Sequence, residues 1–278
     1  MKLLCGNCLE IMKYIPDNSI DLIITDLPYS STRNEWDKPV DLELLWKEYN
    51  RITKDTTPVI LFSQMPFTVD LINSNRKNFR YEIIWRKNIA TGFLNANRMP
   101  LKAHENLLVF YRKLPVYNPQ KFQGIPYVKT MRRGDSTTNY GSHGENQAKS
   151  LDGKRYPLDV VEFKVVNTGG GNARKDDRHL HPTQKPLRLL EYLISTYSNK
   201  GDTVLDNCFG SCSTGVACLN TKRNFIGIEM NKEYFIKGRE WLIDEIRTRQ
   251  VLHSRTTCEE IDLYNETYSE EISDNTGN

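Results

Sequence analysis

Short apolar runs alternate with amphipathic stretches along most of the chain. Several of these runs are apolar on both faces and rich in Val, Ile and aromatic residues. Strands of a parallel sheet that is covered by helices on both sides show this pattern. The pattern predicts seven β-strands, at Leu3–Cys5, Ile20–Thr25, Pro58–Phe62, Tyr81–Trp85, Asn106–Tyr111, Thr203–Asp206 and Asn224–Glu229.

The stretches between the strands have the periodicity of helices. The clearest of them begins after Pro186 and repeats Leu and Ile at helical spacing. The pattern predicts helices at Leu42–Ile52, Pro66–Asn73, Leu187–Tyr197, Ser213–Asn220 and Lys232–Gln250. Alternating strands and helices favour an α/β fold of the Rossmann-like, doubly wound type, with a mostly parallel seven-stranded sheet.

Two internal stretches lack a hydrophobic periodicity. Residues 118–156 are polar and rich in glycine near their centre, and residues 167–177 contain three consecutive glycines. Long irregular segments inside an α/β protein are typically functional loops or disordered segments. After about residue 256 the chain is acidic and poor in apolar residues, so we expect a disordered tail there.

The composition excludes several classes of protein. Hydrophobic residues make up 38% of the 278 residues, charged residues 26% and aromatic residues 10%, unlike a disordered chain, a collagen-like repeat or a coiled coil. No apolar run approaches the roughly 18 residues of a membrane span, and the first residues turn polar at once, unlike a secretory signal. Six cysteines without such a signal indicate free thiols, so we expect a cytoplasmic protein.

Positive charge is concentrated in the middle of the chain. The net charge is +3, but residues 111–160 carry nine Lys or Arg against four Asp or Glu, and residues 251–278 carry one against seven. Clustered positive charge is typical of surfaces that contact a phosphate backbone. A merely solvated surface can have the same composition, so charge alone leaves both interpretations open.

A candidate catalytic motif, Asp26-Leu27-Pro28-Tyr29, directly follows the second predicted strand. Doubly wound folds place their active sites at the carboxyl ends of strands. The exocyclic amine of a nucleobase is a poor nucleophile, because its lone pair is delocalised into the ring. A carboxylate and a backbone carbonyl held extended by the following proline can accept both N–H bonds of such an amine, while the tyrosine stacks on the base. Taken alone, the motif is equally compatible with an ordinary turn after a strand.

A second motif has the layout of a nucleotide-binding loop. The strand Thr203–Asp206 leads into the small residues of 210–215, where a helix begins. About twenty residues further on, the strand Asn224–Glu229 ends in an acid that can accept hydrogen bonds from ribose hydroxyls. The glycine pattern that binds phosphates is incomplete. The motif therefore favours an adenosine-containing cofactor that has no pyrophosphate.

Together with His181-Pro182-Thr183-Gln184-Lys185-Pro186, these motifs make the chain resemble the amino-group DNA methyltransferases that use S-adenosylmethionine. The order of catalytic motif, basic segment and cofactor loop is that of the beta class of this family. The motif Asp-Leu-Pro-Tyr is similar to that of solitary or phage-borne bacterial enzymes. The resemblance runs from about Leu4 to Arg249 and includes Leu61–Phe67, Ala90–Leu94 and His104–Tyr111.

This resemblance implies a division of the chain into four parts. Residues 1–117 would form the catalytic half of the methyltransferase domain, and residues 118–172 a target-recognition insertion. Residues 173–250 would form the cofactor-binding half, and residues 251–278 the acidic tail.

The resemblance also implies a role for each site residue. Asp26, the Leu27 carbonyl, Pro28 and Tyr29 would form the catalytic site. S-adenosylmethionine would be the cofactor, and no metal would be needed. The adenine of the cofactor would lie near Asn7 and its ribose near Glu229. Its methionine part would lie among Asp206, Gly210, Ser211 and Thr214. Thr183 and Lys185 would close over the cofactor, with Lys185 near the cofactor carboxylate.

Two residues depart from the family pattern. Leu27 replaces the first proline of the catalytic motif, where only the carbonyl is needed. Cys212 replaces a second glycine, and because glycine suits a positive φ or the close approach of a ligand, we expect Cys212 to crowd the cofactor loop. Cys5 and Cys8 with Cys208 and Cys212 could form a four-sulfur zinc site, but their spacing favours small buried thiols.

The expected activity is sequence-specific methylation of the N6 amine of adenine in double-stranded DNA, after the base has flipped out of the duplex. In the resembling family, the adenine enzymes usually begin the motif with aspartate and the cytosine-N4 enzymes with serine. Alternatives are cytosine-N4 methylation, methylation of RNA or of a protein amide, and a catalytically inactive DNA-binding relative. The basic insertion favours duplex DNA over a peptide.

Six basic residues of the insertion are candidates for contacts to DNA phosphates or guanines: Lys121, Lys129, Arg132, Arg133, Lys154 and Arg155. The alternative for each is a solvated charge. A homodimer and an accompanying restriction enzyme are compatible with the resemblance, but no residue pattern points to either.

Overall fold

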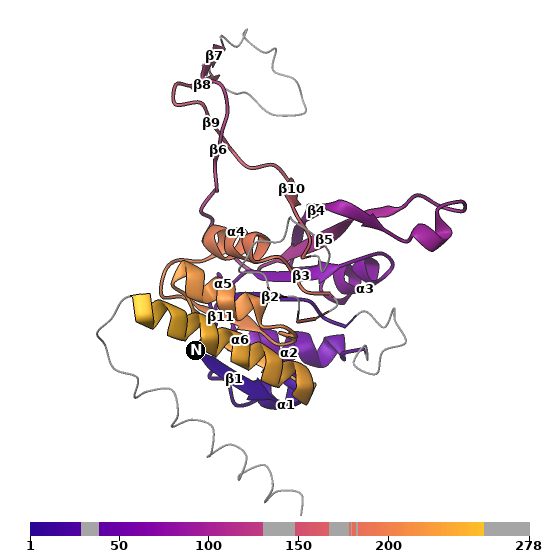
Figure 1. Ribbon diagram of the computed structural model, residues 1–278, viewed down its shortest axis with the longest axis vertical. Helices are drawn as coiled ribbons and strands as arrows, with labels where there is room; N and C mark the ends of the chain where they lie inside the picture. Colours follow the sequence, from indigo (N-terminus) through magenta and orange to yellow (C-terminus); the bar gives the residue numbers. More distant parts are fainter. Residues whose placement is uncertain (29–38, 130–147, 167–177, 179, 182, 253–278) are drawn as a thin grey trace, which may run out of the picture.

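The computed structural model describes residues 1–28, 39–129, 148–166, 178, 180–181 and 183–252. Within these residues the main feature is an eight-stranded sheet with the order β1-β12-β11-β2-β3-β5-β4-β10 (Figure 1). Its strands are β1 Lys2–Cys5, β2 Leu22–Thr25, β3 Val59–Ser63, β4 Phe79–Thr91, β5 Lys102–Phe110, β10 Val160–Phe163, β11 Thr203–Asp206 and β12 Asn224–Glu229. Of these strands, β5 alone runs against the others, because only its pairings with β3 and β4 are antiparallel.

The predicted α/β, doubly wound, mostly parallel sheet is confirmed, with a correction to the number of strands. All seven predicted strands occur, and the sheet has an eighth, β10, which pairs with β4 at the edge. In β10 only Val161 is buried, so the strand shows neither a continuous apolar run nor a long alternation. A single buried side chain between irregular segments gives no periodic signal, which is why the sequence pattern does not predict this strand.

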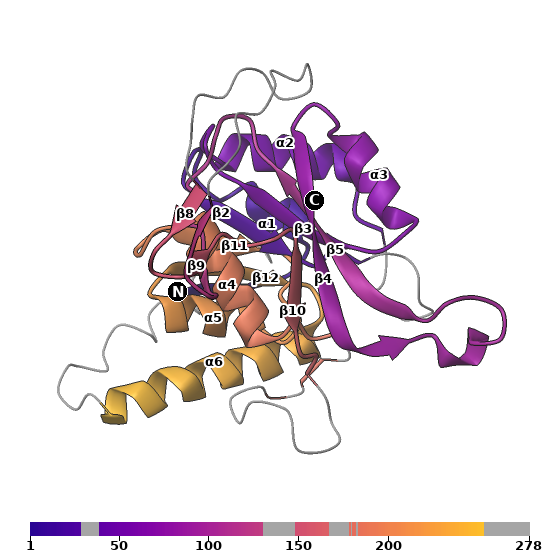
Figure 2. The ribbon, with the colours of Figure 1, turned by 90° about the horizontal axis from the view of Figure 1, so that it is seen from above.

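Helices cover both faces of the sheet (Figure 2). One face carries α1 Cys8–Met12, α2 Leu42–Ile52 and α3 Phe67–Ser74, and the other carries α4 Leu187–Tyr197, α5 Ser213–Thr221 and α6 Lys232–Leu252. Each layer has its own hydrophobic core, formed by buried residues of the helices and of the facing strands. The five predicted helices are confirmed to within two residues at each end, whereas the five-residue α1 is too short to show a period.

The strand order places a topological switch point between β2 and β11. From β2 the chain passes through α2 to β3 on one side, and from β11 it passes through α5 to β12 on the other. The two connections leave neighbouring strands in opposite directions, so a crevice opens at the carboxyl ends of β2 and β11. Open α/β sheets bind their ligands in this crevice.

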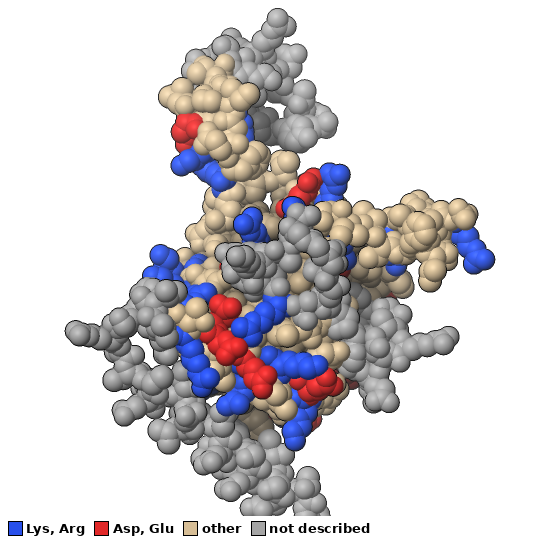
Figure 3. Space-filling model, viewed as in Figure 1, with Lys and Arg blue, Asp and Glu red and all other residues tan. Residues whose placement is uncertain are grey.

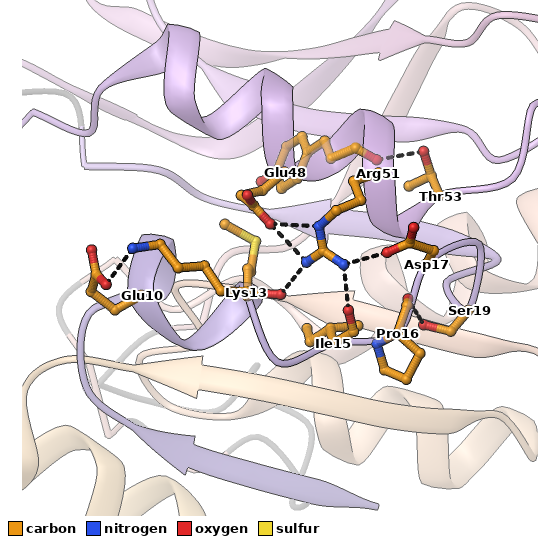
Figure 4. A network of polar contacts seen from close by, with 11 residues as sticks. Glu10, Lys13, Ile15, Pro16, Asp17, Ser19, Glu48, Arg51 and Thr53 are labelled. Carbon is orange, nitrogen blue, oxygen red and sulfur yellow. Dashed lines mark hydrogen bonds and ion pairs between the residues drawn. The ribbon is translucent and has the colours of Figure 1, made fainter. Parts of the chain in front are cut away.

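Arg51 fixes the end of α2 against the segment that connects α1 to β2 (Figure 4). Its guanidinium donates to the carbonyl oxygens of Met12 at 2.6 Å and Ile15 at 2.8 Å. It also pairs with the carboxylates of Asp17 at 2.6 Å and Glu48 at 2.7 Å. These contacts hold α1, whose start borders the crevice, and the segment before β2 in a fixed position relative to α2.

Two projections extend from the sheet (Figure 1). The strands β4 and β5 continue beyond their neighbours as a hairpin, with the short 3₁₀ helix η1 Phe93–Asn95 near its tip. The described residues between β5 and β10 include two antiparallel pairs, which form a small lobe. They are β6 Phe122–Gln123 with β9 Lys154–Arg155, and β7 Tyr127–Lys129 with β8 Ala148–Ser150. No helix in the described ranges is both long and apolar enough to span a membrane.

Candidate functional site

A cavity of about 490 Å³ lies at the switch point. It is bordered by the carboxyl ends of β2, β11 and β12, the start of α1 and the segment before α4. The cavity brings together every predicted catalytic and cofactor residue that the structure describes: Asn7, Asp26, Leu27, Pro28, Thr183, Lys185, Asp206, Gly210, Ser211, Thr214 and Glu229. Tyr29 lies outside the described residues. The residues that the sequence predicts as a site therefore lie together at one cavity, and their roles remain predictions.

The catalytic motif lies immediately after β2. The Leu27 side chain is only 2% exposed and packs in the core beneath α2, which anchors the backbone on both sides of it. Within the described part of the chain, no donor forms a hydrogen bond with the Leu27 carbonyl. The Asp26 carboxylate lines the cavity and forms an ion pair with the Lys185 ammonium. The motif thus presents two oxygen acceptors on consecutive residues at the cavity.

Asp206 holds the loop between β11 and α5. Its carboxylate accepts a hydrogen bond from the Thr214 hydroxyl at 2.6 Å and one from the Cys208 backbone N–H at 3.1 Å. Burial raises the pKa of Asp206 to about 6, although both hydrogen bonds act in the opposite direction. These hydrogen bonds show that the Asp206 carboxylate stabilises the conformation of the loop.

Glu229, at the end of β12, holds the same loop from the opposite side. Its two carboxylate oxygens accept hydrogen bonds from the backbone N–H groups of Gly210, at 2.9 Å, and Asn231, at 2.8 Å. Burial raises the pKa of Glu229. Gly210 has φ +51°, and a Cβ there would lie 3.4 Å from the ring of His181. The positive φ is therefore what favours glycine at this position, since a Cβ would meet the His181 ring only at ordinary van der Waals distance.

Asn7 and Thr183 border the cavity from two other elements. Asn7 is the N-cap of α1, and its side-chain oxygen accepts a hydrogen bond from the Leu9 backbone N–H at 2.9 Å. The Thr183 backbone N–H donates to the Nδ1 atom of His181 at 3.3 Å. The His181 ring packs edge-on against Tyr234 of α6, with 4.3 Å between the ring centroids. No sequence motif points to Tyr234, because its contact with His181 joins segments that are about fifty residues apart.

Lys185 is the residue whose surroundings differ most from the expectation. The family resemblance suggests a position near the cofactor carboxylate, whereas the structure pairs its ammonium with Asp26. The ammonium also lies 3.4 Å from Glu105 of β5 and 5.0 Å from the centroid of the Phe62 ring of β3. Burial alone would lower the pKa of Lys185, but the carboxylates of Asp26 and Glu105 outweigh it and raise the pKa. No role for Glu105 follows from the sequence alone, although Glu105 lies in the segment His104–Tyr111 that is part of the family resemblance.

The cysteines are free thiols in the described part of the chain. Cys8, Cys212 and Cys218 are buried, but Cys5 is exposed, so the expectation of buried thiols is wrong for Cys5. Cys212 has φ +65° and does not line the cavity. Instead, its sulfur lies 2.7 Å from the point where a Cβ on Gly215 of α5 would be placed. The described residues hold no cluster of three or more His, Cys, Asp or Glu arranged to bind a metal.

Three of the six predicted DNA-contacting side chains belong to the lobe. Lys121 and Lys154 are exposed, and the Lys121 ammonium lies over the Tyr156 ring, 4.4 Å from its centroid. Arg155 is half-buried and donates to the Gly153 carbonyl at 2.9 Å, so it helps to hold the lobe together. Figure 3 shows Lys and Arg side chains on the lobe and on the hairpin of β4 and β5. The Lys129 side chain, Arg132 and Arg133 lie outside the part of the chain that the structure describes.

Comparison with known proteins identifies the family. The family model for DNA methylases matches residues 20–237. The type II methyltransferase M.HpaI of Haemophilus parainfluenzae is 28% identical over 255 residues, which cover 88% of this chain and 74% of that protein. The DNA adenine methyltransferase YhdJ of Escherichia coli K12 is 28% identical over 245 residues, which cover 84% of this chain and 79% of that protein.

Solved structures agree with this result. The M1.HpyAVI-SAM complex has a TM-score of 0.57 and 26% identity, and the match covers 87% of this chain and 98% of that one. The cytosine-N4-specific PvuII DNA methyltransferase has a TM-score of 0.60 over 91% of this chain and 93% of that one. At 15% identity, this second likeness shows the fold alone. Because the family model spans the sheet from β2 to β12 and most of the residues that line the cavity, the chain belongs to the DNA methylase family.

Proposed function

We propose that this protein is a site-specific DNA methyltransferase that moves the methyl group of S-adenosylmethionine to the N6 amine of adenine in double-stranded DNA. The observation that carries the proposal is the pair of acceptors on Asp26 and Leu27, at the switch-point cavity of a DNA methylase. The choice of adenine rests on the aspartate that begins the motif. It is supported by the similarity to YhdJ, which is named a DNA adenine methyltransferase.

The cavity fits S-adenosylmethionine in size and in chemistry. Its volume of about 490 Å³ lies within the range of about 300–1,000 Å³ that is usual for small-molecule sites. The backbone at Gly210 leaves room that a side chain would fill. Asn7, Asp206, Ser211, Thr214 and Glu229 all line the cavity. We propose that Asn7 and Glu229 hold the nucleoside and that the other three surround the methionine part. The similar structure of M1.HpyAVI is a complex with SAM.

When bound, S-adenosylmethionine supplies an activated methyl group on a sulfonium, so the work of the protein is alignment and exclusion of water. In the proposed mechanism, the Asp26 carboxylate and the Leu27 carbonyl accept the two N–H bonds of the target amine. These hydrogen bonds direct the nitrogen lone pair out of the plane of the base and into the cavity. The Asp26 carboxylate can also accept the proton that the amine loses on methylation.

The target base has to leave the duplex to reach Asp26. A base amine inside a stacked helix is inaccessible, and enzymes that modify bases flip them into a pocket. We propose that Tyr29 stacks on the flipped base and that the lobe and the hairpin contact the flanking DNA. The exposed Lys121 and Lys154 of the lobe support this orientation. A homodimer, an accompanying restriction enzyme and a cytoplasmic location remain predictions.

Methylated nucleosides identify the product. The purified protein is incubated with S-adenosylmethionine and unmethylated duplex DNA, and the DNA is digested to nucleosides and separated by mass spectrometry. We expect N6-methyladenine as the product. N4-methylcytosine as the main product would contradict the assignment of the base but not the methyl transfer. If no methylated nucleoside forms and calorimetry detects no binding of S-adenosylmethionine, the protein is an inactive DNA-binding relative.

A further inference from the structure

Four side chains of alternating charge lie in a row behind the proposed catalytic motif. The Lys185 ammonium pairs with Asp26 on one side and lies 3.4 Å from Glu105 Oε2 on the other. Glu105 Oε1 in turn pairs with the ammonium of Lys87 on β4. The exposed fractions of the Lys185, Glu105 and Lys87 side chains are 9%, 7% and 11%, so these three are nearly closed to solvent, whereas Asp26 at the cavity is 22% exposed.

One oxygen in this row has no hydrogen-bond partner within the described residues. Glu105 Oε1 accepts a hydrogen bond from the Gln64 side-chain amide at 3.3 Å and pairs with Lys87. Glu105 Oε2 is buried and accepts no hydrogen bond there, although the Lys185 ammonium is only 3.4 Å away. Buried carboxylate oxygens are costly to leave unpaired. Glu105 Oε2 is therefore available as a second acceptor for the Lys185 ammonium.

The carboxylate of Asp26, by contrast, already accepts a hydrogen bond. The Lys185 ammonium donates to Oδ2, one of the two oxygens of the carboxylate that the proposed mechanism assigns to the target amine. An ammonium on one oxygen neutralises part of the charge of the carboxylate. A strongly held ammonium would therefore weaken the hydrogen bond that the amine donates to Asp26 and polarise the amine less. The reaction is therefore helped if the ammonium has a second acceptor within reach.

We propose that the Lys185 ammonium shifts from Asp26 to Glu105 Oε2 when the target amine enters, and that Glu105 is a positioning residue that acts through Lys185. This inference rests on the assignment of Asp26 to the target amine. The shift is short, because Glu105 Oε2 is already 3.4 Å from the ammonium. The Phe62 ring, 5.0 Å from the ammonium, faces it as a weak cation–π partner.

The charges of the row stay fixed during the shift. The carboxylates of Asp26 and Glu105 raise the pKa of Lys185 in spite of its burial. Burial raises the pKa of Glu105, but Lys185 and Lys87 outweigh it and lower the pKa. Both groups are therefore ionised at neutral pH, and the shift moves an ammonium between two carboxylates without any transfer of a proton.

The test is a double-mutant cycle with Glu105→Gln and Lys185→Met. Glu105→Gln keeps the shape of the side chain and removes its charge, so the ammonium stays on Asp26. We expect the single-turnover rate of methyl transfer to fall at least about tenfold, as for loss of an aligned catalytic contact. The dissociation constant for S-adenosylmethionine should stay within about threefold. In the Lys185→Met background, where no ammonium competes, Glu105→Gln should lower the rate further by less than about twofold.

A pH profile provides a second measurement that a purely structural role would not change. Because the Glu105 carboxylate helps to raise the pKa of Lys185, Glu105→Gln should lower the pH at which Lys185 loses its proton and no longer competes for Asp26, so the rate of this variant should recover at alkaline pH. The groups that face Lys185 are Asp26 after β2, Glu105 on β5 and the Phe62 ring on β3. The control is Glu162→Gln on β10, an exposed glutamate whose partner Arg86 lies at 2.7 Å. It should change neither the rate nor the profile.

Three results would overturn the inference. One is an unchanged rate in Glu105→Gln. Another is a double variant whose rate falls by the full product of the two single-variant losses, which would mean that Glu105 does not act through Lys185. Unfolding caused by Glu105→Gln would give the same result. The third is a fall in affinity for S-adenosylmethionine as large as the fall in rate. Asp26→Ala tests separately whether Asp26 binds the target amine. If it does not, Asp26→Ala retains turnover, whatever the effect of Glu105→Gln.

Discussion

Two carboxylates at the cavity differ in what they contact. Asp26 pairs with a side-chain ammonium and faces the cavity beside the Leu27 carbonyl. Glu229 accepts hydrogen bonds from the backbone of Gly210 and Asn231, and so belongs to the loop that borders the proposed cofactor. At the scale of single residues, the two acids should therefore control different steps, transfer for Asp26 and cofactor binding for Glu229.

Replacing each acid by alanine separates these steps. Asp26→Ala should lower the rate of methyl transfer by at least about a hundredfold, because the amine loses its charged acceptor, while cofactor affinity stays within about threefold. Glu229→Ala should weaken cofactor binding. Calorimetry with S-adenosylmethionine and a single-turnover assay measure the two quantities. Loss of cofactor binding with retained turnover in Asp26→Ala would show that the roles are assigned wrongly.

Cys212 lies in a backbone conformation that glycine adopts more easily. Its φ of +65° disfavours side chains with a Cβ by roughly 1–2 kcal/mol, but its buried sulfur fills the space beside Gly215. Cys212→Gly should leave cofactor affinity unchanged or raise it. Cys212→Ala, which loses the sulfur and keeps the strain, should unfold at a lower temperature than Cys212→Gly. A large loss of affinity in Cys212→Gly would show that the cysteine is a required contact.

The sequence predicts which residues reach the cavity, but not all of their partners. Asp26 and Asp206 end neighbouring apolar strands, so their positions follow from the strand pattern. The partners of Lys185 do not, because its ammonium reaches Asp26 after β2 and Glu105 on β5, which are both far from it in the sequence. Such contacts depend on how the segment before α4 lies against the sheet, which no local pattern encodes.

At the scale of elements, the loop between β11 and α5 depends on a buried acid. Burial raises the pKa of Asp206 to about 6, compared with about 3.9 in an unfolded chain. Between these values the folded protein binds a proton that the unfolded chain has released. The contribution of Asp206 to the free energy of unfolding therefore falls as the pH rises from about 4 to about 6, and is constant above that range.

Asp206→Asn should remove this pH dependence. The variant cannot titrate there, so its free energy of unfolding relative to the wild type should increase by roughly 2–3 kcal/mol from about pH 4 to about pH 7. Denaturant unfolding of both proteins at several pH values measures the difference. A difference that stays constant, or decreases with rising pH, would mean that the Asp206 carboxyl is not buried as a raised-pKa acid.

Elements that are long and periodic follow from the sequence, whereas short ones do not. The eleven-residue helices α2 and α4 have the predicted bounds, because several turns with a buried stripe determine them. The helix α1 has five residues and begins at the Asn7 cap, and β10 buries only Val161. Their existence depends on the rest of the fold, which supplies the sheet edge and the cap environment.

At the scale of the whole molecule, the lobe and α1 lie at opposite ends (Figure 1). If the lobe contacts DNA, an exposed lysine on it should contribute through phosphate contacts. Lys154→Ala should weaken DNA binding about equally for all sequences and reduce the slope of log affinity against log salt by about 1. Lys13→Ala, at the C-cap of α1, is the matched control and should change neither the affinity nor the salt slope. Equal effects of the two variants would place the DNA elsewhere.

The most direct test of the account is modification-sensitive sequencing of DNA from bacterial cells that express either the wild-type protein or Asp26→Ala. It reports the methylated base, its sequence context and the activity in one measurement. The account predicts N6-methyladenine at one recurring short sequence with the wild type, and none with Asp26→Ala. Absence of modified adenine with the wild type, or the same modification with Asp26→Ala, would contradict it.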